Sequence, residues 1–300
     1  MATGRELYAR MRSVLEVPIL NDKFWSKVPT VPADAIMVDL EDSATPTTKS
    51  LVRERVIAEL GDPKHFGGRH VIVRVNNLDT LWGRADLEAL AEAEGDFLVC
   101  YPKVDTAEEL AEVSAILRAG RAPRGLHVMI ETARAVQNLD AIAGSEGVHG
   151  LHFGYVDYAS DVGSRAFDES GADLYGPANH FARAAISVAA AAHGLFLTGG
   201  SLIPEYKDLE KVERFVRVWA DTGYTACIAV SPAHLPVINS VMTPSGSEVE
   251  AAREVCGSYE DAVKQGAPAA VLNGRVITLP DYRVAARLMA RAAHPGDGEK

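Results

Sequence analysis

Three short apolar runs, FLVCYPKV (97–104), LHVMIET (126–132) and VHGLHFGY (148–155), alternate with two helix-like segments at 106–119 and 133–143. Most positions in each run are apolar, whichever face they would occupy, which is typical of strands covered on both faces of a parallel sheet. A chain in which such strands alternate with helices folds as an α/β protein. This stretch therefore predicts an α/β fold built on a parallel sheet.

The same pattern continues toward both termini. The remaining apolar runs lie at 13–20, 35–42, 70–76, 195–200 and 226–232, and further helical patterns lie at 47–60, 84–93, 178–193 and 209–222. Several helical segments begin with a capping signal, such as Asp105-Thr106-Ala107-Glu108. Eight strand–helix units in about 250 residues favour a closed (β/α)8 barrel, the TIM barrel, over an open sheet.

The chain continues beyond the eighth run. A helix entry at 244–247 precedes a helical pattern at 248–265, a short segment at 271–279 contains an Asn273-Gly274 turn, and a final helix is expected at 281–293. We therefore expect a TIM barrel over residues 1–243 and a C-terminal helical extension over residues 244–300.

Composition limits the partners. The formal net charge of −11 opposes binding to nucleic acid or to an acidic membrane, because both require a positive face. Residues 1–16 contain no apolar stretch of signal-peptide or transmembrane length, so the expected compartment is the cytoplasm. Cys100, Cys227 and Cys256 are odd in number and widely spaced, and are interpreted as buried small hydrophobes.

Polar side chains collect where the predicted strands end. In a parallel barrel these ends meet at one mouth, which is where active sites lie. Carboxylates and cations from five strands would converge there: Glu41 and Asp42, Arg74 and Asn76, Lys103, Glu131, and Asp157.

Such a cluster of carboxylates needs a cation. Like charges held close together raise one another's pKa unless something neutralises them. Mg²⁺ does so with one or two direct carboxylate ligands and a shell of water molecules. Glu131 and Asp157 follow adjacent strands and are the expected ligands, while Glu41 and Asp42 would hold metal-bound waters or act in proton transfer.

Each position also has a simpler interpretation. Glu131 could interact with a helix N-terminus, Asp157 could cap a turn, and Arg74 could belong to a structural ion pair. Gly154 would allow a ligand to approach the backbone closely, or mark a turn alone. Lys103 could form a Schiff base, which would place the chain in another aldolase class. The histidines with no mutual metal-binding spacing are interpreted as structural: His149, His152 and His193.

Five segments together resemble one family. They are Ala35–Ser43 with Lys49 downstream, Val73–Asn76, Tyr101–Val104, Ile130–Ala133 and Gly154–Tyr158. In this order they are similar to the citrate lyase β-subunit-like and malyl-CoA lyase-like enzymes, the HpcH/HpaI aldolase family of the phosphoenolpyruvate/pyruvate barrel superfamily. The resemblance covers roughly residues 12–160.

The resemblance implies a metal site and an assembly. It implies that Glu131 and Asp157 bind Mg²⁺, that Arg74 binds the carboxylate or carbonyl of a small oxo acid, and that Glu41 and Asp42 support the water shell of the metal. We expect Asn76, Lys103 and Gly154 to contribute to substrate binding. The family also implies a homotrimer or homohexamer, in which the extension packs over a neighbouring barrel.

The chain departs from the family near both ends. Ile19 stands where the family has glycine, Ser231 where it has histidine, and Thr278 where acyl-CoA lyases have an acidic residue with a catalytic role. These differences bear on acyl-CoA specificity and leave the expected metal residues unchanged.

The expected function is a Mg²⁺-dependent carbon–carbon lyase. It would release glyoxylate or pyruvate from a hydroxyacyl-CoA such as malyl-CoA or citramalyl-CoA by retro-Claisen or retro-aldol cleavage. One alternative is a pyruvate-type class II aldolase acting on a 4-hydroxy-2-oxo acid. Another is a non-catalytic or partner-dependent subunit like citrate lyase β, which Thr278 favours and the complete set of Glu131, Asp157 and Arg74 opposes.

Overall fold

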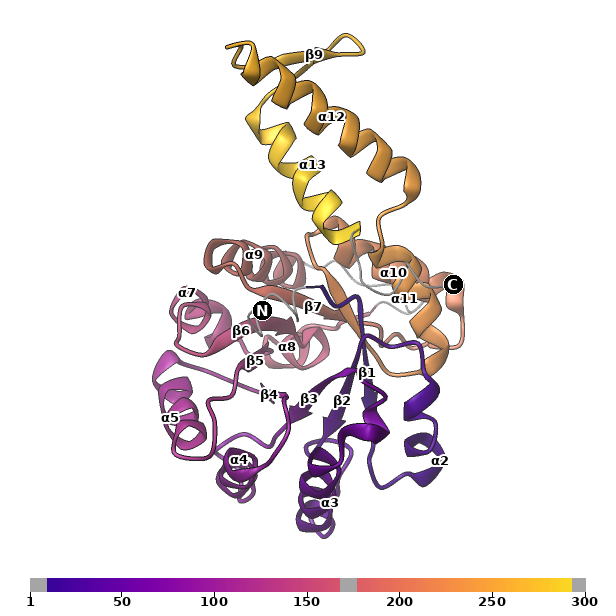
Figure 1. The fold of residues 1–300 in the computed structure, drawn as a ribbon. Coiled ribbons are helices and arrows are strands. Elements are labelled where there is room, and N and C mark those ends of the chain that lie inside the picture. The colour runs from indigo at the N-terminus through magenta and orange to yellow at the C-terminus, as the bar shows by residue number, and fades with distance from the viewer. Residues whose placement is uncertain (1–9, 168–176, 293–300) are drawn as a thin grey trace. The chain divides into compact units, whose positions relative to one another are not determined.

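The computed structural model describes residues 10–167 and 177–292. These residues divide into two compact units, one up to Ser240 and one from Val241 onward (Figure 1). The sequence placed this boundary between residues 243 and 244, and the structure places it between residues 240 and 241.

The first unit is a closed barrel of eight parallel strands, which confirms the predicted fold class. The barrel closes where Ser13 pairs with Cys227 between the first and eighth strands. Figure 1 shows helices arranged around the strands. The strands are β1 (Ser13–Val17), β2 (Ala35–Asp39), β3 (His70–Arg74), β4 (Leu98–Tyr101), β5 (Leu126–Ile130), β6 (Val148–Phe153), β7 (Phe196–Gly200) and β8 (Ala226–Ala229).

Most helices of the barrel lie where the sequence pattern predicts them. These are α3 (Lys49–Gly61), α4 (Gly83–Glu92), α5 (Ala107–Arg118), α9 (Pro177–His193) and α10 (Leu209–Asp221). The predicted helix at 133–143 is instead two helices, α6 (Ala133–Gln137) and α7 (Leu139–Ala143), which meet at Asn138. The sequence analysis missed α2 (Asp22–Trp25), α8 (Tyr155–Asp161) and α11 (Leu235–Met242), and the 3-10 turns η1 (Val28–Thr30), η2 (Pro63–Phe66) and η3 (Pro232–His234).

Apolar side chains fill the barrel, as the two-sided apolar runs predict. The interior cluster combines residues from most of the strands: Met11, Val14, Ala35, Met37, Ile72, Leu98, Cys100, Met129, Phe196, Ala226 and Ile228. The three cysteines are free and buried, as expected.

An aromatic layer joins α10 to the barrel. Trp219 is fully buried, packs against Phe153, Phe215 and Tyr224, and donates its indole N–H to the Gly200 carbonyl at 2.9 Å. A side chain at Gly199 would collide with the Trp219 ring. The strand therefore has glycine where this helix packs most closely.

The second unit is a helical extension, as predicted. Helix α12 (Gly246–Lys264) begins with a capping box made by Ser245 and Glu248. A hairpin of β9 (Ala270–Leu272) and β10 (Arg275–Ile277) turns at Asn273 and Gly274, which have φ values of 50° and 77°. Helix α13 (Leu279–Ala292) packs on α12 through a small apolar cluster that includes Ala252, Cys256 and Ala285.

Thr278 has a defined structural role in this extension. Its backbone N–H and its hydroxyl both bond to the Asp281 carboxylate, at 2.9 and 2.7 Å, at the start of α13. Arg275 donates to the other oxygen of Asp281 at 2.7 Å. Thr278 therefore stands at the N-terminus of α13, where the Asp281 side chain accepts its backbone N–H as in one half of a capping box.

Among the described residues, no helix combines the length and apolarity needed to cross a membrane.

We predict that Trp219→Ala destabilises the barrel strongly. Replacing a buried Trp by Ala removes its apolar contacts and leaves a cavity, which costs about 3–5 kcal/mol. Urea unfolding monitored by circular dichroism measures this loss. Leu81→Ala is the matched control, because Leu81 is 92% exposed and should change stability by less than about 0.5 kcal/mol. Equal unfolding midpoints for the two variants would contradict this account of the core.

Candidate active site

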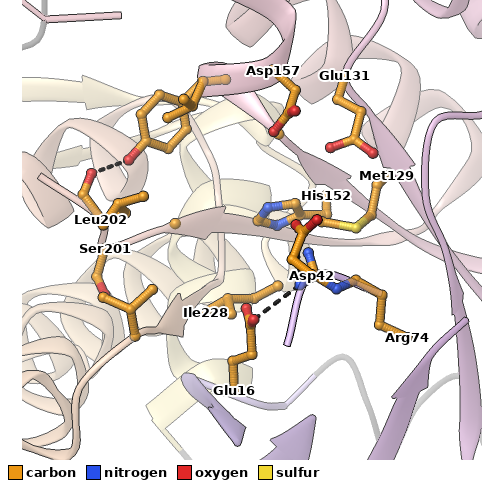
Figure 2. Close-up of a pocket in the computed structure, with 15 residues that line it drawn as sticks. Glu16, Asp42, Arg74, Met129, Glu131, His152, Asp157, Ser201, Leu202 and Ile228 are labelled. Atoms are coloured by element: carbon orange, nitrogen blue, oxygen red, sulfur yellow. Dashed lines mark hydrogen bonds and ion pairs between the residues drawn. The ribbon is translucent and has the colours of Figure 1, made fainter. Parts of the chain in front are cut away.

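A cavity of about 200 Å³ opens at the carboxyl ends of the barrel strands (Figure 2). This is the end of the barrel at which the sequence analysis placed the site. Strand ends and the loops that follow them supply its lining: Glu16, Asp42, Arg74, Met129, Glu131, His152, Gly154, Tyr155, Val156, Asp157, Gly200, Ser201, Leu202, Ile228 and Val230.

Arg74 at the end of β3 is the central cation. Its Nε atom donates to Asp39 at 2.7 Å, and one terminal nitrogen donates to Glu16 at 3.0 Å. Glu41 and Asp42 lie 3.4 and 3.5 Å from its terminal nitrogens. Burial alone would raise the pKa of Asp39, but hydrogen bonds and the charge of Arg74 hold that pKa below its ordinary value. Arg74 is therefore both a structural ion-pair partner and a cavity-lining cation.

Hydrogen bonds from the buried Lys49 fix the loop after β2. Lys49 is buried, and its Nζ atom donates to the carbonyls of Leu40 and Glu41 and to Oδ1 of Asn76, at 2.9, 2.6 and 2.6 Å. The amide nitrogen of Asn76 donates to Leu40 and Asp86. Asn76 therefore lies inside this network and does not line the cavity. The structure gives the Asn76 amide a structural role, and its contact with substrate stays a prediction.

Glu131 projects from the end of β5 and is only 4% exposed. One carboxylate oxygen accepts the backbone N–H of Lys103 at 2.7 Å. Gly154 lies against the same side chain, and a Cβ atom at Gly154 would approach Glu131 Cβ to 2.7 Å. Gly154 thus makes room for the Glu131 side chain, and it also lines the cavity, so its predicted contact with a ligand stays a prediction.

The two expected metal ligands both reach the cavity. Asp157 lies in the first turn of α8, and Figure 2 shows its carboxylate and that of Glu131 directed into the cavity. The pKa of Glu131 is raised to about 7. Burial is the largest cause, Lys103 acts against it, and the charges of Glu41 and Asp157 add to it. A buried carboxylate with like-charged neighbours is a suitable ligand for a hard divalent cation.

Two carboxylates suit Mg²⁺, which keeps water ligands, better than they suit a metal ion that needs three or more side-chain ligands. The described residues contain no group of three or more His, Cys, Asp or Glu side chains placed to bind one ion. Mg²⁺ commonly keeps several waters and takes only one or two carboxylates, so two ligands and an open cavity suffice.

Lys103 and Glu41 form an ion pair beside the cavity. Lys103 has a φ of 51°, and its ammonium contacts the Glu41 carboxylate. Burial alone would lower the pKa of Lys103, but the Glu41 hydrogen bond and nearby carboxylates raise it above its ordinary value. Schiff-base lysines are typically activated by a lowered pKa, so this environment does not favour that chemistry.

Sequence reasoning missed two titratable groups in the cavity. Glu16 lies within β1, and burial raises its pKa to about 7 although Arg74 lowers it. His152 on β6 was interpreted as structural, yet it lines the cavity and is 5% exposed. The sequence signal for Glu16 was a charged residue inside the otherwise apolar run at 13–20.

His193, which the sequence analysis interpreted as structural, pairs with Asp140 on the protein surface at 2.9 Å.

Comparison with known proteins identifies the relatives of this chain. It is 33% identical over 284 residues to a (3S)-malyl-CoA thioesterase of Cereibacter sphaeroides, covering 94% of each chain. It is 29% identical over 280 residues to an L-malyl-CoA/beta-methylmalyl-CoA lyase of Rhodobacter capsulatus, covering 87% of each. The second relative is a carbon–carbon lyase, the class that the sequence analysis expected.

Solved structures support the same grouping. Protein CitE from Mycobacterium tuberculosis, in complex with magnesium, acetoacetate and coenzyme A, matches with a TM-score of 0.73 and 25% identity, covering 94% of this chain and 98% of that one. A citrate lyase from Burkholderia xenovorans matches in fold with a TM-score of 0.80 and 22% identity, over 93% of this chain and 91% of the other. The family model for HpcH/HpaI aldolase/citrate lyase matches residues 12–232. The chain therefore belongs to the HpcH/HpaI aldolase/citrate lyase family, as the five sequence segments predicted.

Proposed function

We propose that this protein is a Mg²⁺-dependent carbon–carbon lyase that cleaves a short hydroxyacyl-CoA, such as malyl-CoA or citramalyl-CoA, into an oxo acid and an acyl-CoA. One observation carries the proposal. Glu131 and Asp157 at the ends of β5 and β6 face the same cavity as Arg74. A metal-binding carboxylate pair opposite a cation is what an acid with a neighbouring hydroxyl or oxo group requires.

Different residues would bind the metal and the substrate. Glu131 and Asp157 would hold Mg²⁺, which as a Lewis acid stabilises negative charge on the oxygens of the substrate. Arg74 would attract the substrate carboxylate. Lys103 and Glu41 would keep the Glu131 side of the cavity in place through their ion pair and through the backbone N–H of Lys103. We also expect the extension to pack on a neighbouring subunit in a homo-oligomer.

Glu16 is suited to move the proton. In the cleavage, a base takes the proton of the substrate hydroxyl, the carbon–carbon bond breaks, and the acyl carbon that receives the electron pair takes up a proton. A group whose pKa lies near 7 can accept and return a proton at neutral pH. Glu16 lines the cavity and has such a pKa.

Hydrolysis of the thioester is the second candidate function. The 33% identity to a (3S)-malyl-CoA thioesterase favours it. In that reaction water adds to the thioester carbonyl, and the products are a free acid and the CoA thiol. The same acidic half of the substrate would occupy the cavity in both reactions.

Product analysis separates the two reactions. With malyl-CoA and Mg²⁺, we expect glyoxylate, trapped as its phenylhydrazone, to appear in equal amount with acetyl-CoA and without free thiol. Release of thiol with malate and no glyoxylate would reject the lyase in favour of the thioesterase. A parallel incubation with citramalyl-CoA and 4-hydroxy-2-oxo acids identifies the carbon skeleton. No product from any of these substrates would instead support the partner-dependent subunit.

Loss of the Glu131 carboxylate should remove metal binding. In the wild type, Mg²⁺ at a hundred times its Kd should stabilise the fold by about 2.7 kcal/mol, seen as a rise in the unfolding temperature that EDTA abolishes. Glu131→Gln should show no such rise, and its kcat/KM should fall more than ~100-fold, beyond the effect of most outer-sphere partners. Asp140→Asn is the control, because Asp140 is an exposed carboxylate. An undiminished Mg²⁺ effect in Glu131→Gln would exclude Glu131 as a ligand.

Borohydride tests the Schiff-base alternative. Because Lys103 stays charged beside Glu41, we expect sodium borohydride added with pyruvate to leave the activity unchanged and the protein mass unmodified. Covalent attachment of the pyruvate carbons to Lys103, detected by mass spectrometry, would place the chain in the Schiff-base aldolase class.

A further inference from the structure

A chain of three buried polar side chains crosses the barrel interior. The Thr198 hydroxyl on β7 lies 2.9 Å from Nε2 of His127 on β5 and 2.9 Å from Nδ1 of His152 on β6. His127 and Thr198 are 0% exposed, and His152 is 5% exposed. The three residues lie on three consecutive strands, so strand pairing fixes their positions.

Both imidazole rings in this chain are neutral. Burial lowers the pKa of His127 to about 4, and burial lowers the pKa of His152 well below its ordinary value, with His127 and Arg74 adding to the effect. Hydrogen bonds from the rings to the backbone of Leu151 and Thr198 act against burial without overcoming it. A neutral imidazole has one N–H group that donates and one bare nitrogen that accepts.

The two backbone hydrogen bonds locate the ring protons. His127 bonds to the Leu151 backbone and His152 to the Thr198 backbone, and a carbonyl only accepts, so each ring donates its N–H there. Nε2 of His127 faces the Thr198 hydroxyl, which leaves the proton on Nδ1 of His127. In His152 the nitrogen that faces Thr198 is Nδ1, and it carries the proton. The single hydroxyl proton of Thr198 then goes to Nε2 of His127, so the chain of bonds is consistent.

Nε2 of His152 is therefore a bare acceptor. It has no hydrogen-bond partner within the described part of the chain, and His152 lines the cavity. Figure 2 shows the His152 ring between the Glu131–Asp157 pair and Arg74. A bare nitrogen attracts an O–H group of a ligand and repels carboxylate and oxo oxygens, because these present only lone pairs. This part of the cavity therefore favours a ligand with a proton to donate.

We propose that Nε2 of His152 accepts a hydrogen bond from the substrate hydroxyl that neighbours the carboxylate, and that Thr198 is a positioning residue that holds the ring in this tautomer. The inference rests on the proposed function and sets the orientation of the acidic half of the substrate. The carboxylate, which has no proton at neutral pH, lies toward Arg74, and the hydroxyl lies toward His152. The cavity therefore prefers a hydroxy acid to the corresponding oxo acid.

This contact leaves the proton transfer to Glu16. His152 has too low a pKa to keep a proton at neutral pH, so it binds the hydroxyl without deprotonating it. Rotation about the C–O bond turns the O–H group toward Glu16, whose pKa is raised to about 7 and which takes the proton as the carbon–carbon bond breaks. The oxygen is then an oxo group with no proton for His152, which favours release of the oxo acid.

Lactate and pyruvate are matched probes, because they differ only in bearing a hydroxyl or an oxo group next to the carboxylate. We measure the Kd of pyruvate and of each enantiomer of lactate by calorimetry with Mg²⁺ present. His152→Leu should raise the Kd of the tighter-binding lactate by about 3- to 10-fold, the range for a neutral hydrogen bond, and leave that of pyruvate unchanged. Unchanged pyruvate binding also shows that the variant is folded. An equal change for both acids, no change for lactate, or no lactate binding by the wild type would overturn the proposal.

Two further variants control this experiment. His152→Gln, whose side-chain oxygen accepts a hydrogen bond, should recover most of the affinity for lactate. His149→Leu is the matched control, because His149 is on the same strand but does not line the cavity, and it should leave both Kd values unchanged. A loss of lactate affinity in His149→Leu as large as that in His152→Leu would overturn the assignment to His152.

Nitrogen-15 NMR of the histidine rings tests the tautomer and the positioning role. In the wild type we expect the His152 proton on Nδ1, and we expect lactate, but not pyruvate, to shift the Nε2 resonance toward its protonated value. Thr198→Val should weaken lactate binding and leave pyruvate binding unchanged, and Thr198→Ser should restore the wild-type values. A proton on Nε2 of His152 in the unliganded protein would overturn the proposal. If lactate affinity depends on His152 but no CoA thioester is cleaved, the proposed function fails while this contact stands.

Discussion

The buried ion pair between Arg74 and Asp39 is the interaction on which the rest of the site depends. The two residues are register partners at the ends of β3 and β2, and Asp39 also accepts the backbone N–H groups of Glu41 and Ser43. One carboxylate therefore orients the cavity cation and shapes the loop that carries Asp42. Removing Arg74 would leave the buried Asp39 carboxylate without its counter-ion, at a cost of about 3–5 kcal/mol.

Around this pair the cavity holds more negative than positive charge. Glu16, Asp42, Glu131 and Asp157 line it, and Arg74 is the cation among its lining residues. Burial is the largest cause of the raised pKa values of Glu16 and Glu131, and neighbouring carboxylates raise both pKa values further. In the proposed function, a divalent cation would balance this charge on the Glu131 side. Glu16 on the opposite side has a pKa raised to about 7, so in the proposed function metal binding and proton transfer would fall to different carboxylates.

Strand-end residues could be predicted from sequence because the rule for locating them is local. Glu131, Asp157 and Arg74 follow or end apolar runs, and parallel strands bring such ends together. Glu16 and His152 lie inside runs, where a polar residue points either into the cavity or toward the helices, and only the pairing register decides between the two. The hydrogen bonds of Asn76 could not be predicted from the local sequence, because its amide group bonds to Lys49 and Asp86, which lie elsewhere in the chain. The break at Asn138 likewise lies inside a continuous helical pattern.

The proposed metal ligands, Glu131 and Asp157, do not by themselves choose between carbon–carbon cleavage and hydrolysis, because both reactions would place the same acidic half of the substrate in the cavity. The choice depends on whether water reaches the thioester carbon. In the proposed function the small acid would occupy this cavity, and the thioester would lie toward its opening. Val156 and Leu202 line the cavity and are 38% and 44% exposed. Because both side chains are open to solvent in the structure, the group that covers them when substrate binds decides whether water reaches the thioester and which of the two reactions follows.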